Sequence, residues 1–499
     1  MDHWHDEKGA EVESQEIDLD TLASLPASHQ RPALLYRSNA PLGQNLKTHP
    51  SSLPSPLAPK VLPLSACHAK GGNVGTRLLL FRPSILAFGL SAIWLGSCTS
   101  LLPLRPNTAA NPNNSVVATN GYEIAFIEFG EQGSYQDPTQ LKNALDLIRV
   151  TEKPLVITYV HGWQNDVQSD DVAKFESLLA RLNRAPAIRA LGFHLVGVYL
   201  AWRGKLTPVP VLKEISFWNR KATAERLASN YDCYDAIASI SEEARKHGRA
   251  RNYTVLLGHS FGGLIVERSV AHAVNAEIHG HADSDRSMPA DLMIAVNPAS
   301  DSILARQMIA ALYSRKTENT RPLFVSITST GDWATGTFFP IGAGLASVSK
   351  GFNKVRAPGP DNMPESERNF YTSTPGHNGM LINRATVDLH KTINSPQGHP
   401  ALETNLEHNL VGDVFTLDGA NGKLDLWQIK RIGGVDVPYW DVKVDASIIA
   451  NHGDLWNERA EAMMAAIFRM SNPMLNPQAK PRANLHKQAD FSRLQSSPH

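Results

Sequence analysis

The chain reads Tyr253-Thr-Val-Leu-Leu-Gly-His-Ser-Phe-Gly-Gly263 where an apolar, β-favouring run gives way to the helix-forming run 262–273. Ser260 stands between Gly258 and Gly262, in the small-x-Ser-x-small pattern of a nucleophile elbow. Glycine is needed at both flanking positions because a side chain there would collide across so tight a turn. We therefore expect a strained strand–turn–helix corner that presents the Ser260 hydroxyl. The helix N-terminus behind it would offer N–H groups to an anion.

Around this corner, apolar β-rich runs alternate with amphipathic helical runs, the pattern of an α/β protein with a doubly wound, mostly parallel sheet. The strands are expected at residues 123–129, 155–160, 194–200, 254–257, 292–296 and 323–327. The helices are expected at residues 138–149, 171–183, 222–228, 235–246, 262–274, 302–313 and 456–470. Between 333 and 400 the rhythm breaks, which predicts an irregular, lid-like excursion. The runs 426–431 and 439–444 predict a hairpin or two edge strands.

The composition is that of an ordinary globular protein, with 42% hydrophobic and 19% charged residues in a chain of 499. Lys+Arg and Asp+Glu both number 48, so the formal net charge is zero, and no basic block indicates nucleic acid or another polyanion. The three cysteines, Cys67, Cys98 and Cys233, form neither a disulfide framework nor a C-x-x-C metal pair. We expect no nucleic-acid partner and no metal site.

The first hundred residues differ from the rest of the chain. Residues 1–75 carry no sustained helical or strand period, which predicts a disordered leader or a reading frame extended upstream of a true start near Val74. Residues 76–98 then contain a basic flank, an apolar stretch of about a dozen residues and Leu95-Gly-Ser-Cys98, in the order of a secretory signal. The alternative is an internal apolar helix in a cytoplasmic protein.

The end of this segment resembles a bacterial lipobox, in which small residues precede a cysteine that is lipidated and becomes the mature N-terminus. The resemblance implies a lipid anchor on Cys98, contact with a membrane and a place in a bacterial cell envelope. Residues 99–120 are then expected to be a flexible linker, and residues 121–472 the folded domain. The polar tail, residues 473–499, is expected to be disordered.

A second motif lies in Leu155-Val-Ile-Thr-Tyr-Val-His-Gly-Trp163, a buried strand that ends in His-Gly. Together with the Ser260 corner, it resembles the α/β-hydrolase superfamily, in which the N–H after His-Gly supplies half of an oxyanion hole. The resemblance assigns that N–H to Trp163 and the second donor to Phe261. His161 and Gly162 are expected to support the site by holding this loop, and the alternative role for His161 is that of a base.

A serine nucleophile needs a base and the base an orienting acid, and both are expected after strands at the carboxyl edge of the sheet. Asp332 comes after the run 323–327 and a Gly turn, so that the chain order Ser…Asp…His agrees with the superfamily. The alternative role for Asp332 is that of a turn or helix-cap aspartate. His452 comes after the last expected strand and precedes the last helix, the place expected for the base. The competing bases lie in the irregular region and are His377, His399 and His408.

Three further strings are expected near the site. Trp202 and Arg203 end a strand, and residues 216–221 come shortly after them. These two strings either line the substrate pocket or form a lid, or they are a packed aromatic loop with a solvated arginine. Asn297-Pro298 comes after its own strand and is expected to hold the loop beneath the serine.

These motifs look like those of a group of poorly characterised bacterial esterase-like proteins, over roughly residues 120–470. The resemblance implies a serine esterase or lipase-like enzyme that cleaves a small or lipid-like carboxylic ester through an acyl-enzyme. Ser260, His452 and Asp332 would be catalytic, with no metal or organic cofactor. The alternatives are a thioesterase or acyltransferase on the same scaffold, and a membrane-anchored binding or scaffold protein without catalytic activity.

Overall fold

The computed structural model describes residues 102–119, 121–205, 210–248, 252–278, 288–314, 321–356, 364–379, 381, 384–395, 398–407, 413–433 and 437–475. All of them belong to one compact unit, Arg82–His499. The expected leader, the signal-like segment with Cys98 and the tail after residue 475 lie outside the described residues. Residues 102–119 pack on the domain instead of forming a free linker. For example, the N–H groups of Leu104 and Arg105 each donate to the Glu128 carboxylate at 2.8 Å.

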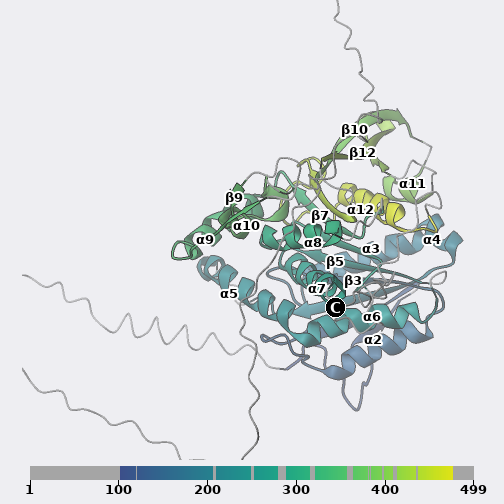
Figure 1. Ribbon diagram of the computed structural model, residues 1–499. Coiled ribbons are helices and arrows are strands. Elements are labelled where there is room, and N and C mark those ends of the chain that lie inside the picture. The colour runs from purple at the N-terminus through teal and green to yellow at the C-terminus, as the bar shows by residue number, and fades with distance from the viewer. Residues whose placement is uncertain are drawn as a thin grey trace, which may run out of the picture. The chain divides into compact units, whose positions relative to one another are not determined.

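A central sheet dominates the described part of the chain, with eleven strands in the order β1-β2-β4-β3-β5-β6-β7-β13-β10-β12-β11 (Figure 1). From β2 to β10 all neighbours are parallel, and antiparallel pairs occur only at the two ends. This confirms the α/β class with a mostly parallel sheet. The strands are β1 (Val116–Ala118), β2 (Tyr122–Phe129), β3 (Pro154–Val160), β4 (His194–Trp202), β5 (Tyr253–His259), β6 (Leu292–Val296), β7 (Phe324–Ser329), β10 (Arg384–Asn394), β11 (Val414–Asp418), β12 (Lys423–Gly433) and β13 (Tyr439–Val444).

Helices cover both faces of the sheet (Figure 1). Successive residues of a strand point to opposite faces of the sheet, and a hydrophobic core lies on each face. In β3, Leu155, Ile157 and Tyr159 pack in the first core, whereas Val156 and Val160 pack in the second. The first core is closed by α3 (Asp170–Arg184), α4 (Pro186–Leu191), α11 (Ala401–Glu407) and α12 (Glu458–Ser471). The second is closed by α2 (Pro138–Val150), α5 (Pro210–Ser229), α6 (Tyr231–Arg245), α7 (Phe261–Ile278) and α8 (Ser302–Ser314). Because parallel strands share one carboxyl edge, the loops after β3, β5, β6, β7 and β13 meet there.

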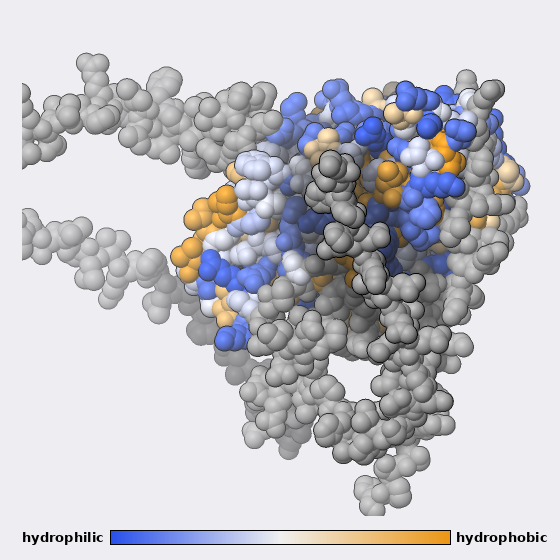
Figure 2. All heavy atoms as spheres, turned by 90° about the horizontal axis from the view of Figure 1, so that it is seen from above, coloured by the Kyte–Doolittle hydropathy of each residue, from blue (hydrophilic) through white to orange (hydrophobic). Residues whose placement is uncertain are grey.

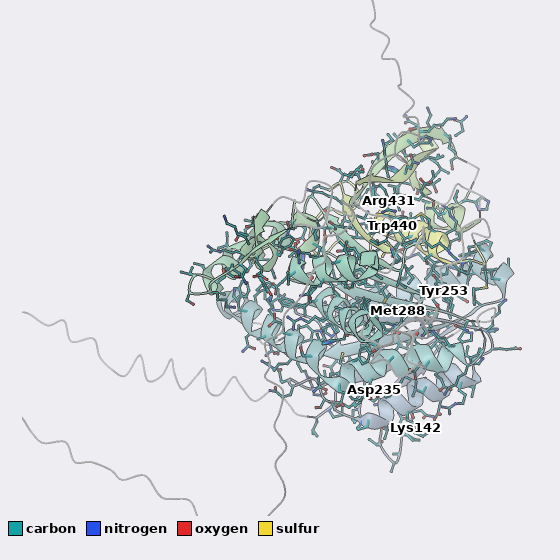
Figure 3. The ribbon with its side chains drawn as sticks, viewed as in Figure 1. Lys142, Asp235, Tyr253, Met288, Arg431 and Trp440 are labelled. Atoms are coloured by element: carbon teal, nitrogen blue, oxygen red, sulfur yellow. The ribbon has the colours of Figure 1, made fainter. Side chains whose placement is uncertain are left out.

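The expectation that residues 426–431 and 439–444 form a hairpin or two edge strands is wrong. β12 pairs with β10 and β11, whereas β13 lies between β7 and β10 and is parallel to both. The physical reason is burial: all residues of β13 except Lys443 are buried, as in a central strand covered on both faces. Across β10, the Arg431 guanidinium lies 5.7 Å from the centre of the Trp440 ring (Figure 3).

The expected excursion between 333 and 400 is more regular than its composition indicated. Its described part contains a π-helical turn (Ala334–Phe338), α9 (Phe339–Ala346), α10 (Glu367–Tyr371) and a two-stranded sheet of β8 (Lys354–Arg356) and β9 (Pro364–Ser366). Residues 384–394 form β10 and join the central sheet. A register shift between Leu389 and Lys391 interrupts β10. Apolar and polar residues therefore do not alternate regularly along this strand, and the sequence carries no strand signal there.

Glu267 is a carboxyl group buried between α7 and β13. Ser300 Oγ and Tyr439 OH both donate hydrogen bonds to it, the second at 3.3 Å. Burial raises the pKa of Glu267 from its ordinary value of 4.5 to about 8. The folded chain therefore holds this proton at neutral pH, whereas the unfolded chain releases it.

Glu267 is expected to make stability fall as pH rises from about 4.5 to about 8, by up to about 1.4 kcal/mol per pH unit. Below that window both states carry the proton, and the full stability is present. Glu267→Gln stays neutral, so urea unfolding should show a flatter pH profile and a larger free energy of unfolding at the upper end. Glu243→Gln is the control, because burial would raise the pKa of Glu243 but the hydrogen bonds from Lys246 and Arg149 outweigh it and lower that pKa. Replacing this carboxylate by an amide should therefore destabilise the fold. An unaltered pH slope in Glu267→Gln would contradict the assignment.

Candidate active site

Ser260 occupies the corner between β5 and α7 with φ of 57°, in the left-handed region that non-glycine residues rarely adopt. Its N–H donates to the Val296 carbonyl at 3.1 Å, which holds the corner against β6. The flanking glycines are required by close backbone contacts. A Cβ on Gly262 would lie 1.9 Å from the Val160 carbonyl oxygen, and one on Gly258 would lie 2.6 Å from the Gly262 oxygen. The expected strained corner is therefore present.

His452 and Asp332 lie in line with Ser260. His452 Nε2 is 2.8 Å from Ser260 Oγ, and His452 Nδ1 is 2.9 Å from Asp332 Oδ2. An ionised Asp332 places the imidazole proton on Nδ1, which leaves Nε2 free to accept the serine proton. The structure thus joins residues from three loops, after β5, β7 and β13, into one hydrogen-bonded relay.

Asp332 sits in a pocket that favours its charged form. Its side chain is fully buried, and burial by itself would raise the pKa. The bond from His452 and those from the N–H (3.1 Å) and hydroxyl of Thr335 outweigh burial and hold the pKa of Asp332 below its ordinary range. The π-helical turn that starts at Ala334 supplies both Thr335 donors. His452 keeps a side-chain exposure of 25%, so the imidazole borders solvent while its carboxylate partner does not.

The loop that carries His452 is fastened by two side chains. The His452 carbonyl accepts from His259 Nε2 at 2.7 Å and from Asn297 Nδ2 at 3.1 Å. Asn297 Oδ1 also accepts a hydrogen bond from the Ser329 N–H at 2.9 Å. The Asn297 side chain therefore links the ends of β6 and β7 to the loop of His452. Burial, and after it the nearby His452, lowers the pKa of His259 to about 4, which keeps that ring neutral at pH 7. Asn297 was expected to hold the loop beneath the serine, and its side chain instead bonds to the loop of His452 and to the end of β7. His259 was missed, and its only sequence signal is its place directly before the serine.

The two residues expected to donate N–H groups, Phe261 and Trp163, belong to segments that lie close to Ser260. Phe261 is the first residue of α7, so its N–H has no acceptor within the helix. The loop of Trp163 lies close to the serine, because a Cβ on Gly162 would be 2.8 Å from Ser260 Cβ. The Phe217 ring lies 4.9 Å from that of Phe261 and 5.3 Å from that of Trp163, centre to centre.

His161 lies in the loop core and contacts neither Ser260 nor Asp332 by any described hydrogen bond. Its Nδ1–H donates to the Gly162 carbonyl at 2.9 Å, and its Nε2 accepts the Trp202 N–H at 3.1 Å. The rings of His161 and Trp202 stack 5.6 Å apart with 4° between their planes. Burial lowers the pKa of His161, so the ring is neutral and holds the His-Gly loop in place.

The structure also places the remaining histidines and the aromatic strings. His377 ends a short 3₁₀ turn beside Gly336, where its Cε1 would be 2.8 Å from a Cβ added there, and it makes no described bond to Ser260. His399 is exposed, and His408 lies outside the described residues. Arg203 donates to the Leu102 carbonyl at 2.6 Å. In the described part of the chain, no group of three or more His, Cys, Asp or Glu side chains is arranged to hold a metal ion.

No family model matches this chain, and a search of curated proteins finds no match. Among solved structures, the chain is similar to phospholipase PlaB from Legionella pneumophila in complex with thio-NAD, at 11% sequence identity and a TM-score of 0.26. The match covers 65% of this chain and 63% of that one, so the chain spans less than two thirds of its neighbour. A likeness this distant carries no conclusion about activity.

Proposed function

We propose that the protein is a serine hydrolase of the α/β-hydrolase type that cleaves a carboxylic ester through an acyl-enzyme. The observation that carries the proposal is the relay from Ser260 Oγ through His452 to Asp332, with contacts of 2.8 and 2.9 Å. The strained backbone at Ser260 supports the same interpretation, because such strain is typical of a residue held for function.

In the proposed reaction, Ser260 Oγ attacks the ester carbonyl while His452 Nε2 takes the serine proton. Asp332 holds the Nδ1–H tautomer and stabilises the imidazolium. The tetrahedral oxyanion accepts hydrogen bonds from the N–H groups of Trp163 and Phe261, each worth roughly 3 kcal/mol of barrier. Collapse breaks the C–O bond, and His452 returns its proton to the leaving alcohol. Water then attacks the acyl-enzyme by the same route and releases the acid.

The described lid-like segment favours an apolar acyl group. The Phe338 ring lies 5.4 Å from the Phe217 ring, which in turn contacts Phe261 at the elbow. Aromatic side chains in contact with one another therefore connect this segment with Phe261, the residue that follows the serine. We accordingly include lipid-like esters in the substrate class, and rates on p-nitrophenyl esters of increasing chain length test this. Rates that fall steeply beyond the shortest acyl chains would exclude it.

We also propose, from the lipobox-like pattern alone, that Cys98 carries a lipid anchor in a bacterial envelope. Mass spectrometry of the native N-terminus tests this, and an unlipidated chain that retains residues before Val74 would reject it. The alternative is a cytoplasmic protein.

A fluorophosphonate probe tests the nucleophile directly. We expect covalent labelling of the wild-type chain at Ser260 and none of Ser260→Ala, because the probe reacts with activated serines and not with ordinary hydroxyls. Ser177→Ala, an exposed helical serine, is the matched control and should label like the wild type. Equal labelling of Ser260→Ala, or none in any variant, would favour the rival hypothesis of a non-catalytic binding protein. Labelling together with faster turnover of thioesters than of oxygen esters would favour a thioesterase.

A further inference from the structure

An apolar patch stands beside the candidate active site. It consists of Trp333, Ile341, Leu345 and Val348, whose residues are 65%, 58%, 71% and 73% exposed. Ile341 and Leu345 are one helical turn apart on α9, so they lie on the same side of that helix. Figure 2 shows apolar residues gathered at the margin where Figure 1 places α9. Soluble proteins rarely expose large apolar side chains together unless the surface has a partner.

The charges within the segment that carries the patch are of one sign, whereas Glu225, Asp301 and Glu367 of other segments line the hollow that Lys350 borders. Residues 333–356 include three basic residues and no acidic one. Lys350 and Lys354, which come after α9, are exposed, and no ion pair joins either of them to another described residue. Apolar side chains with lysines alongside are typical of surfaces that insert shallowly into an anionic bilayer, where the lysines meet lipid phosphates.

One residue of the patch lies next to the relay along the chain. Trp333 comes directly after Asp332, and its ring lies 5.9 Å from that of Phe338. Phe338 contacts Phe217, and Phe217 contacts Phe261. Aromatic side chains in contact with one another therefore join the patch to the corner that carries Ser260.

The described chain begins at the carboxyl edge of the sheet that also carries Ser260. The Leu102 carbonyl accepts from Arg203, which comes directly after β4. Cys98 stands four residues before Leu102, and four extended residues span at most about 14 Å. A lipid on Cys98 would thus keep this edge close to the bilayer.

We propose that the apolar patch docks on the surface of an anionic phospholipid bilayer, so that the active site takes an ester from the membrane. The proposal rests on the proposed function for its substrate, but docking itself needs no catalysis. No helix in the described part of the chain is long and apolar enough to cross a membrane. A second copy of the chain is the rival occupant.

Vesicle co-sedimentation of the full-length chain tests the docking. All variants carry Cys98→Ser, so that no lipid chain contributes. The vesicles are phosphatidylcholine alone, or phosphatidylcholine with about one third phosphatidylglycerol. Leu345→Glu/Val348→Glu is expected to lower partition onto the anionic vesicles at least about tenfold. Val150→Glu/Leu389→Glu, which alters exposed apolar residues elsewhere, should not change it. Lys350→Glu/Lys354→Glu should reduce the preference for anionic over neutral vesicles roughly tenfold or more.

Further readouts separate this proposal from the proposed function. Ser260→Ala should bind vesicles like its parent and lose only hydrolysis. Leu345→Glu/Val348→Glu should keep its melting temperature and its turnover of a soluble short-chain ester. Equal partition of the patch variant and the Val150/Leu389 control would overturn the docking surface. It would also be overturned if sedimentation velocity showed a dimer that only the patch variant dissociates, because the patch would then bind a second copy.

Discussion

His452→Ala is expected to lower kcat for ester hydrolysis by about 10⁵- to 10⁶-fold, as far as Ser260→Ala does. The two side chains act as one unit, because the hydroxyl is a weak nucleophile until Nε2, 2.8 Å away, takes its proton. The double variant should therefore be no slower than either single variant. Steady-state rates on a soluble ester, with active-site titration of the wild type, give the measurement.

His377→Ala is the matched control for this experiment. His377 is partly buried, and burial lowers its pKa, but it makes no described bond to Ser260. We expect its loss to change kcat far less than the loss of His452. A larger effect at His377 than at His452, with both variants folded, would assign the base to His377 and contradict the relay.

Asp332→Asn is expected to lower kcat by roughly 10⁴-fold while the fold persists. The amide nitrogen can donate to His452 Nδ1, which moves the imidazole proton to Nε2, where it faces Ser260 Oγ. A protonated Nε2 cannot accept the serine proton. The variant should recover some rate as pH rises and hydroxide takes the place of the base, and a pH–rate profile would show this.

Asp291→Asn is the control, because Asp291 is also a hydrogen-bonded aspartate on this sheet. It accepts from the Thr254 N–H and hydroxyl at 2.9 Å each, next to the start of β6 and so at the amino edge, away from Ser260. Its replacement should alter stability more than kcat. If Asp332→Asn changed only stability as well, Asp332 would be a turn residue, the alternative role that its sequence context allows.

The local parts of the site could be predicted from the sequence because each depends on a few consecutive residues. Gly258 and Gly262 mark the corner, since only glycine fits backbone contacts as short as those to Val160 and Gly262. Asp332 and His452 could be selected because parallel strands bring the loops at their carboxyl ends to one edge of the sheet. In the structure the side chains of Asp332 and His452 form hydrogen bonds in line with Ser260. Their chemical roles are predictions that the kinetic experiments test.

The sheet's second half and the fastening of the His452 loop were decided by long-range packing. β13 looked like one arm of a hairpin with β12, yet it pairs with β7 and β10, because a strand buried on both faces is more stable between neighbours than at an edge. The bonds from His259 and Asn297 to the His452 carbonyl join residues 193 and 155 positions apart. Contacts between residues so far apart produce no periodic pattern in the sequence. They depend on how the whole chain folds and not on the neighbouring residues. Local sterics could therefore be inferred from the order of residues, whereas strand pairing and loop fastening required the tertiary structure.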